Sequence, residues 1–272
     1  MEPDKRRMEQ AYDNMAPGYD SAVGPGIGAL MRQLLGDMDV GEAPVALDVA
    51  CGTGISTFAL IENTGGKGEF HGVDISEGML EGARRSAEAH GLTNVRFTKG
   101  DAENLDYTDA KFDVVISNMS LQFFPDKPRA LAEMHRVLKP GGRLAILFGA
   151  GPMFREVWEV LGEAAARRPE HPGFAASVEE IKAMHIGLEE TEALLEGTGF
   201  EKTYVYARHR LVHYEPEFII HNIPYAGCWK IALPGDVLPE VVEELTERLT
   251  ESRTGKGFRT TWYAIPAYGT KP

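Results

Sequence analysis

"LDVACGTGISTFAL", residues 47–60, is the stretch that decides the fold. It opens with an apolar strand pattern, turns at two close glycines, and continues as a helical pattern from about Ile55. Because glycine has no Cβ, Gly52 and Gly54 can take positive φ and let backbone N–H groups approach a ligand closely. The helix that follows presents the positive end of its dipole to the same place. We therefore predict a strand, a ligand-binding turn and a helix in direct succession.

Similar apolar runs recur before the chain reaches Gly149, and each is followed by a helical pattern. Runs such as "FDVVIS" and "RLAILF" are almost wholly apolar, which is typical of parallel strands covered by helices on both faces. This alternation predicts an α/β fold with a central, mostly parallel sheet. The predicted strands are 45–49, 69–73, 95–99, 113–118 and 143–148, with a helix over 127–138 that ends at "KPGG".

After Gly149 the alternation loosens. Helices broken by "RRPEHPGF" are followed by a helix (188–196) and a strand (203–212), and an acidic helix (237–250) precedes a last strand (259–267). We expect one domain over residues 1–272. Within it we expect an N-terminal lid (1–40), a ligand-binding core (41–150), cover insertions (151–187 and 213–258) and the rest of the sheet (188–212 and 259–269).

Composition limits the class of function. The 41 acidic residues outnumber the 28 basic ones, so the field of the protein repels nucleic acid and anionic membrane surfaces. Two cysteines cannot form a disulfide framework or a cysteine-rich metal site, and no signal-peptide pattern opens the sequence. No apolar run approaches the roughly 20 residues of a membrane span. We expect a cytoplasmic monomer or homodimer with a small-molecule substrate and no metal, nucleic acid or integral membrane association.

The residues around the turn indicate a nucleoside ligand. Asp74 ends the second predicted strand in "FHGVDIS", where its two oxygens can accept both hydroxyls of a ribose. Dinucleotide-binding turns require G-x-G-x-x-G, whereas this turn has Thr57 at the third glycine position. Asp48, just ahead of the turn, would repel a pyrophosphate but attract an ammonium group. S-adenosylmethionine, a nucleoside with an amino-acid zwitterion, fits these residues; an NAD or nucleotide-sugar enzyme is the less favoured alternative.

Motifs in register along the chain resemble those of the class I S-adenosylmethionine-dependent methyltransferases. They are "LDVACGTG" (47–54), "GVDISEGML" (72–80), "GDAENL" (100–105), "FDVVISNMSLQFFPD" (112–126) and "RVLKPGGRLAI" (136–146). The resemblance is strong over 10–150 and weaker beyond. It implies a Rossmann-like, seven-stranded sheet with an antiparallel last strand, helices on both faces and helical lid insertions. The core looks most similar to quinone C-methyltransferases and their natural-product relatives, and "SNMSLQFFPD" also resembles the carboxyl methyltransferase of biotin synthesis.

The resemblance also implies which residues hold S-adenosylmethionine. Asp48 and the turn would meet the methionine end, Asp74 the ribose, and Asp101 the adenine amino group. The cofactor-binding candidates are Tyr19, Asp48, Ala50, Cys51, Gly52, Gly54, Asp74, Ile75, Met79, Asp101, Ala102, Glu103, Asn118 and Met119. The substrate-binding candidates are Tyr12, Gln122, Phe123, His213, Tyr225 and Trp229. Where the family more often has glycine, this chain has Ala50, for which we expect negative φ.

Methyl transfer from a sulfonium is an in-line displacement, so alignment of the reactants can supply much of the catalysis and a dedicated base is optional. Gln122 stands where the family often has a histidine, and glutamine cannot take up a proton. The remaining catalytic candidates are His213 and Tyr19, the latter in a segment similar to the family's lid. We predict O- or C-methylation of a small organic acceptor. The alternatives are a cofactor-binding protein without methyl transfer, a sensor or pericyclase, and a carboxyl methyltransferase of a carrier-bound acid.

Overall fold

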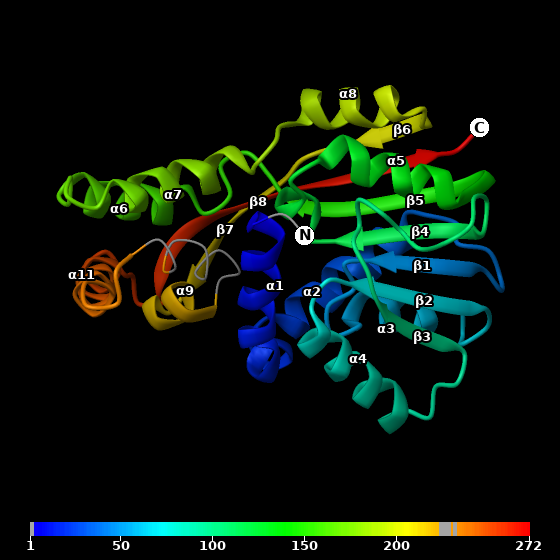
Figure 1. Cartoon of the computed structure of the whole chain (residues 1–272), viewed down its shortest axis with the longest axis horizontal. Coiled ribbons are helices and arrows are strands. Elements are labelled where there is room, and N and C mark those ends of the chain that lie inside the picture. The colour runs from blue at the N-terminus through cyan, green and yellow to red at the C-terminus, as the bar shows by residue number, and fades with distance from the viewer. Residues whose placement is uncertain (1–2, 223–229, 231–232) are drawn as a thin grey trace. The chain divides into compact units, whose positions relative to one another are not determined.

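The structure, a computed structural model, describes residues 3–222, 230 and 233–272 (Figure 1). Contacts divide the chain into two compact units. The first unit consists of Met1–Phe148, Gly187–Ala207 and Ile265–Pro272, and the second of Gly149–Ile186 and Arg208–Ala264. Most residues that were expected in the cover insertions therefore belong to the second unit.

A mostly parallel sheet forms the centre of the first unit. Its strand order is β3-β2-β1-β4-β5-β8-β6, so the direction in which the chain adds strands reverses between β1 and β4. In sheets of this kind, ligands bind beyond the carboxyl ends of the strands at the point of reversal. The strands are β1 Val45–Val49, β2 Glu69–Asp74, β3 Val95–Lys99, β4 Phe112–Asn118, β5 Leu138–Gly149, β6 Glu201–Val205 and β8 Phe258–Thr270.

The Rossmann-like fold class is confirmed, and the first four predicted strands agree with β1 to β4 within one residue. The fifth prediction was wrong at its start, because β5 begins at Leu138, directly after the helix α5 (Lys127–Val137). "KPGG" therefore lies in the strand and does not separate it from the helix. The register between β4 and β5 shifts there, and Gly141 takes φ +78°, a value that glycine adopts without strain.

The strand predicted over 203–212 is two strands, β6 and β7 (Arg208–Tyr214), so the described residues form eight strands where seven were expected. Both strands pair antiparallel with β8. Val205 lies opposite Ala267 and Arg208 lies opposite Ala264, so β6 and β7 keep the same register along β8. The interruption lies opposite Pro266. Tyr206 donates its N–H to the Pro266 carbonyl (3.2 Å), but proline has no N–H to return the bond.

The helices of the first unit have two roles. Met31, Leu34 and Leu35 of α2 (Tyr19–Gly36) are almost fully buried, and α2 packs on α3 (Ile55–Asn63), so this half of the expected lid is part of the core. In contrast, α1 (Pro3–Met15) packs on α4 (Glu77–Ala89), beside the carboxyl ends of the central strands (Figure 1). A 3₁₀ turn (Ala16–Gly18) joins α1 to α2, and α8 (Leu188–Thr198) packs on α5.

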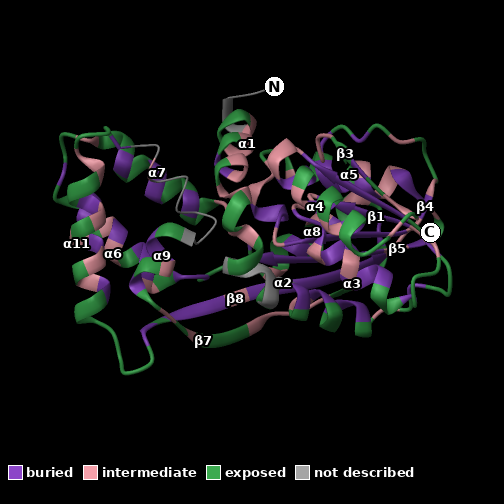
Figure 2. Cartoon of the chain, turned by 90° about the horizontal axis from the view of Figure 1, so that it is seen from below, coloured by how far each residue is buried: buried purple, intermediate pink, exposed green. Residues whose placement is uncertain are grey.

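The second unit contains helices, β7 and the first half of β8, and these two strands pair antiparallel although helices separate them in the sequence. Glu156 anchors β8, since its carboxylate accepts hydrogen bonds from Thr260 Oγ1 (3.0 Å) and from the N–H and hydroxyl of Thr261 (both 2.7 Å). Figure 2 shows β8 buried along most of its length, whereas β7 is largely exposed. No helix in the described part of the chain has the length and apolar character needed to cross a bilayer. The helices are α6 Arg155–Ala166, α7 Pro172–Ala183, α9 Pro216–Asn222 and α11 Leu238–Glu251.

Candidate functional site

A pocket in the first unit lies at the carboxyl ends of the central strands, where the strand order reverses. Its volume is about 100 Å³. Most residues predicted for the site line it: Tyr12, Tyr19, Ala50, Gly52, Asp74, Ile75, Met79, Asp101, Ala102, Glu103, Asn118, Met119 and Phe123. Sequence reasoning missed Lys5, Met8, Val73, Gly100, Ser120, Phe124 and Pro125, which also line it.

Asp74 organises the turn after β1. Its Oδ2 accepts a hydrogen bond from the Gly52 N–H (2.8 Å), and its Oδ1 accepts one from the Ser76 N–H (2.9 Å). Burial raises the pKa of Asp74, while the N–H groups of Ser76 and Gly52 oppose that shift by stabilising the carboxylate. One buried carboxylate thereby ties the turn after β1 to the start of α4, and it also faces the pocket.

The two glycines of the turn have different surroundings. Gly52 takes φ +55°, and a Cβ placed there would meet no atom within 4 Å, so its backbone faces open space. Gly54 takes φ +85° as the N-cap of α3, and a Cβ there would lie 3.0 Å from the rings of Phe58 and Phe97. Gly54 does not line the pocket. We infer that Gly52 allows a ligand close to the backbone, whereas Gly54 allows the turn to pack.

Ala50 lines the pocket in the left-handed conformation, with φ +58°, so the expectation of negative φ was wrong. The turn itself requires this conformation, because the chain must leave β1 and present Cys51 N–H to the Val73 carbonyl (3.0 Å). An L-residue in this region carries about 1–2 kcal/mol of strain.

Ala50→Gly should therefore stabilise the protein. Glycine removes the steric strain at φ +58° but adds freedom to the unfolded chain, so we expect a net gain of about 0.5–1 kcal/mol in the free energy of unfolding. Urea denaturation measures this value. The control is Ala46→Gly in β1, where φ is not positive and the side chain is buried; this variant should be less stable than the parent. A loss of stability in Ala50→Gly would contradict the strain argument.

Asp48 and Cys51 do not line the pocket. Asp48 is 1% exposed, accepts a hydrogen bond from Thr57 Oγ1 at Oδ2 (2.7 Å), and has no partner at Oδ1. Its pKa is raised to about 7, mainly by burial. The hydrogen bond from Thr57 lowers the pKa, and the charge of Asp74 raises it further. Cys51 is buried in an apolar cluster with Leu80, and burial raises the pKa of its thiol. Both side chains support the turn from behind.

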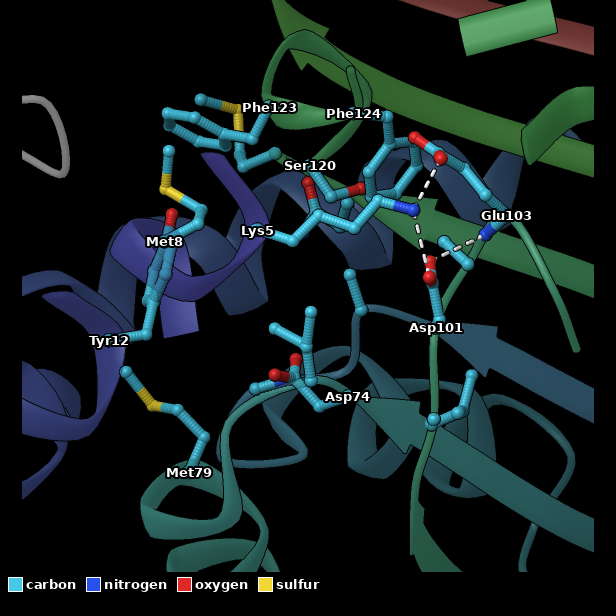
Figure 3. Close-up of a pocket in the computed structure, with 18 of the residues that line it drawn as sticks. Lys5, Met8, Tyr12, Asp74, Met79, Asp101, Glu103, Ser120, Phe123 and Phe124 are labelled. Carbon is cyan, nitrogen blue, oxygen red and sulfur yellow. Dashed lines mark hydrogen bonds and ion pairs between the residues drawn. The ribbon is translucent and has the colours of Figure 1, made fainter. Parts of the chain in front are cut away.

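Aromatic side chains that were predicted to bind the cofactor or the substrate form one wall of the pocket. Tyr12 packs edge-on against Tyr19 (ring centroids 6.4 Å apart) and against Phe123 (6.0 Å). Met8 and Met79 lie on the same side of the pocket as Tyr12 (Figure 3). Burial, followed by the charges of Asp74 and Asp20, raises the pKa of Tyr19. Tyr19 is therefore protonated at neutral pH, so its hydroxyl can donate a hydrogen bond but is a poor base.

The helix α1 is docked through polar side chains four residues apart. Asp13 Oδ1 accepts hydrogen bonds from Ser76 Oγ (2.6 Å) and Gly78 N–H (3.0 Å) at the start of α4. One turn earlier, Glu9 pairs with Lys99 of β3 (2.5 Å). Residues with this spacing share one helix face, so the stripe holds α1 along the rim of the pocket.

Lys5, one further turn back, enters the pocket. Its Nζ lies 2.8 Å from Asp101 Oδ2 and also pairs with Glu103 Oε2 (Figure 3). Asp101 Oδ1 accepts the Glu103 N–H (2.9 Å), and Glu103 Oε1 accepts the Asp126 N–H (2.8 Å). Burial alone would lower the pKa of Lys5, but Asp101 and Glu103 outweigh it and raise the pKa. The i, i+4 spacing of residues 5, 9 and 13 was the signal that could have identified Lys5.

The end of β4 supplies the floor. Asn118 Nδ2 donates to Ser56 Oγ (3.0 Å), and Met119 takes φ +57° as the chain leaves the strand. Gln122 is buried and donates to the Met119 carbonyl (3.0 Å), but it does not line the pocket. In the second unit, His213 is an exposed residue of β7. Tyr225 and Trp229 lie outside the described residues.

Residues 42–156 match a family model described as a methyltransferase domain. A demethylmenaquinone methyltransferase of Staphylococcus epidermidis is 39% identical over 132 residues, which cover 47% of this chain and 54% of that protein. Aklanonic acid methyltransferase DauC of a Streptomyces species is 34% identical over 151 residues, which cover 56% of this chain and 67% of that protein. The chain thus spans about half the length of the first relative and two thirds of the second.

Solved structures show the same fold. A putative methyltransferase from Bacillus halodurans superposes with a TM-score of 0.62 at 20% sequence identity, and the match covers 90% of this chain and 99% of that one. Because identity is this low, the likeness supports the arrangement of strands and helices and no more.

Proposed function

The chain belongs to the class I S-adenosylmethionine-dependent methyltransferases, and from this premise we propose that it transfers a methyl group from S-adenosylmethionine to an oxygen or carbon of a small organic acceptor. One observation carries the proposal. The turn at Gly52, Asp74 at the end of β2 and Asp101 after β3 line one pocket, although they come from three separate strand ends. These are the positions that would meet the methionine end, the ribose and the adenine.

The residues present fit such a cofactor. Each oxygen of Asp74 already accepts one backbone N–H and retains a lone pair, so the carboxylate can also accept two ribose hydroxyls. Gly52 offers backbone with open space before it. Asp101 Oδ1 is held by the Glu103 N–H, which leaves Oδ2 directed toward a donor in the pocket. Asp48 would act on the methionine end through the turn, since its side chain does not line the pocket.

The bound sulfonium supplies an electrophilic methyl group, and the residues of the chain would align an acceptor with it. The rings of Tyr12, Tyr19 and Phe123 would exclude water and place π-electron density near the positive charge, an effect of about 0.5–2 kcal/mol. Among the described residues that line the pocket there is no histidine, and Tyr19 remains protonated. We therefore favour an acceptor that is itself acidic, such as a carboxylic acid, a phenol or an acidic carbon.

The charge of the protein limits the class of acceptor. A net charge of −13 disfavours nucleic acid, so we propose a small-molecule substrate. We also propose a cytoplasmic location and a monomer or homodimer.

Two measurements test the function. Calorimetry should show binding of S-adenosylhomocysteine and none of NADH. Incubation with methyl-labelled S-adenosylmethionine and a small-metabolite extract should give a labelled product, with heat-treated protein as the control. Binding without any labelled product across extracts would instead indicate a protein that uses the cofactor for sensing or for shaping another reaction. Binding of NADH but not of S-adenosylhomocysteine would overturn the assignment.

A further inference from the structure

Lys5 occupies the end of the pocket that the proposed function assigns to adenine. Its side chain crosses from α1 to the strand ends, and its Nζ lies between the carboxylates of Asp101 and Glu103 (Figure 3). The Lys5 side chain is 12% exposed and that of Glu103 is 7% exposed, so this pair is largely shielded from water, whereas the Asp101 side chain is 37% exposed and open to an incoming ligand. A shielded, charge-assisted contact is considerably stronger than a surface ion pair.

The contact uses the oxygen that a nucleobase would need. Asp101 Oδ1 is engaged by the Glu103 N–H, and Oδ2 accepts from Lys5 at 2.8 Å. An adenine amino group is also a hydrogen-bond donor, so it would compete with the ammonium group for the same acceptor. With Lys5 in this position, the base end of the pocket is filled by the protein's own side chain.

We propose that Lys5 is an internal competitor of the cofactor: its ammonium group holds Asp101 and Glu103 until the adenine amino group replaces it on Asp101. The proposal rests on the proposed function. Lys5, Glu9 and Asp13 lie on one face of α1, so release of Lys5 frees one end of the helix while the contacts of Glu9 and Asp13 keep the other end docked. The helix would therefore pivot rather than detach, which admits the cofactor and leaves the aromatic wall in place.

Lys5→Met is the direct test. Methionine keeps the apolar stem but cannot pair with the carboxylates, so S-adenosylhomocysteine no longer has to break the contact. We expect the variant to bind S-adenosylhomocysteine about tenfold more tightly than the parent in calorimetry. Lys5→Arg keeps the positive charge and should bind within about threefold of the parent. Lys99→Met is the control for loosening of the helix, because it breaks the exposed pair with Glu9 of α1 outside the pocket. This variant should change the affinity for S-adenosylhomocysteine by less than about twofold.

A second measurement needs no variant. Acetylation of Lys5 by an amine-reactive ester, followed by mass spectrometry, reports whether the ammonium group is held. Saturating S-adenosylhomocysteine should accelerate this acetylation about tenfold, because a released amine loses its proton more readily. Unchanged or weaker binding by Lys5→Met, or slower acetylation of Lys5 in the presence of the ligand, would overturn the proposal. Failure of the unaltered protein to bind S-adenosylhomocysteine at all would overturn the proposed function as well, so the two failures can be told apart.

Discussion

Asp74→Ala should weaken binding of S-adenosylhomocysteine by roughly 100-fold, or about 3 kcal/mol. The carboxylate does two things that alanine cannot. It would accept the ribose hydroxyls, and it holds the Gly52 N–H (2.8 Å) and the Ser76 N–H (2.9 Å) in place. Loss of the side chain leaves both donors without partners at the pocket wall. Isothermal titration calorimetry measures the change in affinity, and thermal unfolding shows how much of it reflects loss of structure.

Two variants sharpen this test. Asp74→Asn keeps the shape, but its amide must turn an NH₂ group toward one of the two backbone N–H donors, so it should recover little of the affinity. Glu81→Gln changes a carboxylate that pairs with Arg85 on the exposed face of α4, outside the pocket, and should bind like the parent. Parent-like affinity in a folded Asp74→Ala variant would remove Asp74 from the ribose subsite.

The parts of the site that could be predicted from sequence lie close to strand ends. Gly52 and Asp101 come shortly after strands that the sequence predicted, Asp74 ends another, and parallel strands bring their carboxyl ends to one edge of the sheet. The position of each residue is therefore set by local pattern together with one topological rule. No knowledge of distant contacts was needed to place them at one pocket.

What could not be predicted depends on contacts distant in sequence or on backbone detail. The i, i+4 spacing could place Lys5 on the docked face of α1, but it does not show that Lys5 meets Asp101, which lies 96 residues away. Pro266 interrupts the ladder of a strand that comes far earlier in the chain, so 203–212 read as one continuous strand. Ala50 takes φ +58° because the turn as a whole requires it, against the preference of the residue.

Asp48 combines both cases, because its position was predictable and its burial was not. The sequence places it just before the turn, where an ammonium group would be attracted. The structure places it 1% exposed, behind the turn and in contact with Thr57. Burial has a consequence for stability, since a carboxylate without full hydrogen bonding favours its protonated form in such surroundings.

Stability should therefore fall as pH rises through the titration of Asp48. Its pKa is raised from an ordinary value of 3.8 to about 7 in the folded protein, first by burial. Between pH 3.8 and about 7 the folded chain binds this proton and the unfolded chain does not, so raising the pH favours unfolding. The loss should be on the order of 4 kcal/mol across this window. Asp48→Asn, which has no charge at any pH, should lack this loss.

Urea denaturation of both proteins from pH 4 to pH 8 measures the effect as a difference, which cancels the titration of groups that do not interact with Asp48. Asp48→Asn should gain stability relative to the parent as pH rises to about 7, and the difference should then level off. Thr57→Val removes the hydrogen bond that lowers the pKa of Asp48. In that variant the loss of stability should therefore continue to a higher pH than in the parent. Parallel stability curves for the parent and Asp48→Asn would mean that the buried carboxyl group does not titrate in this range.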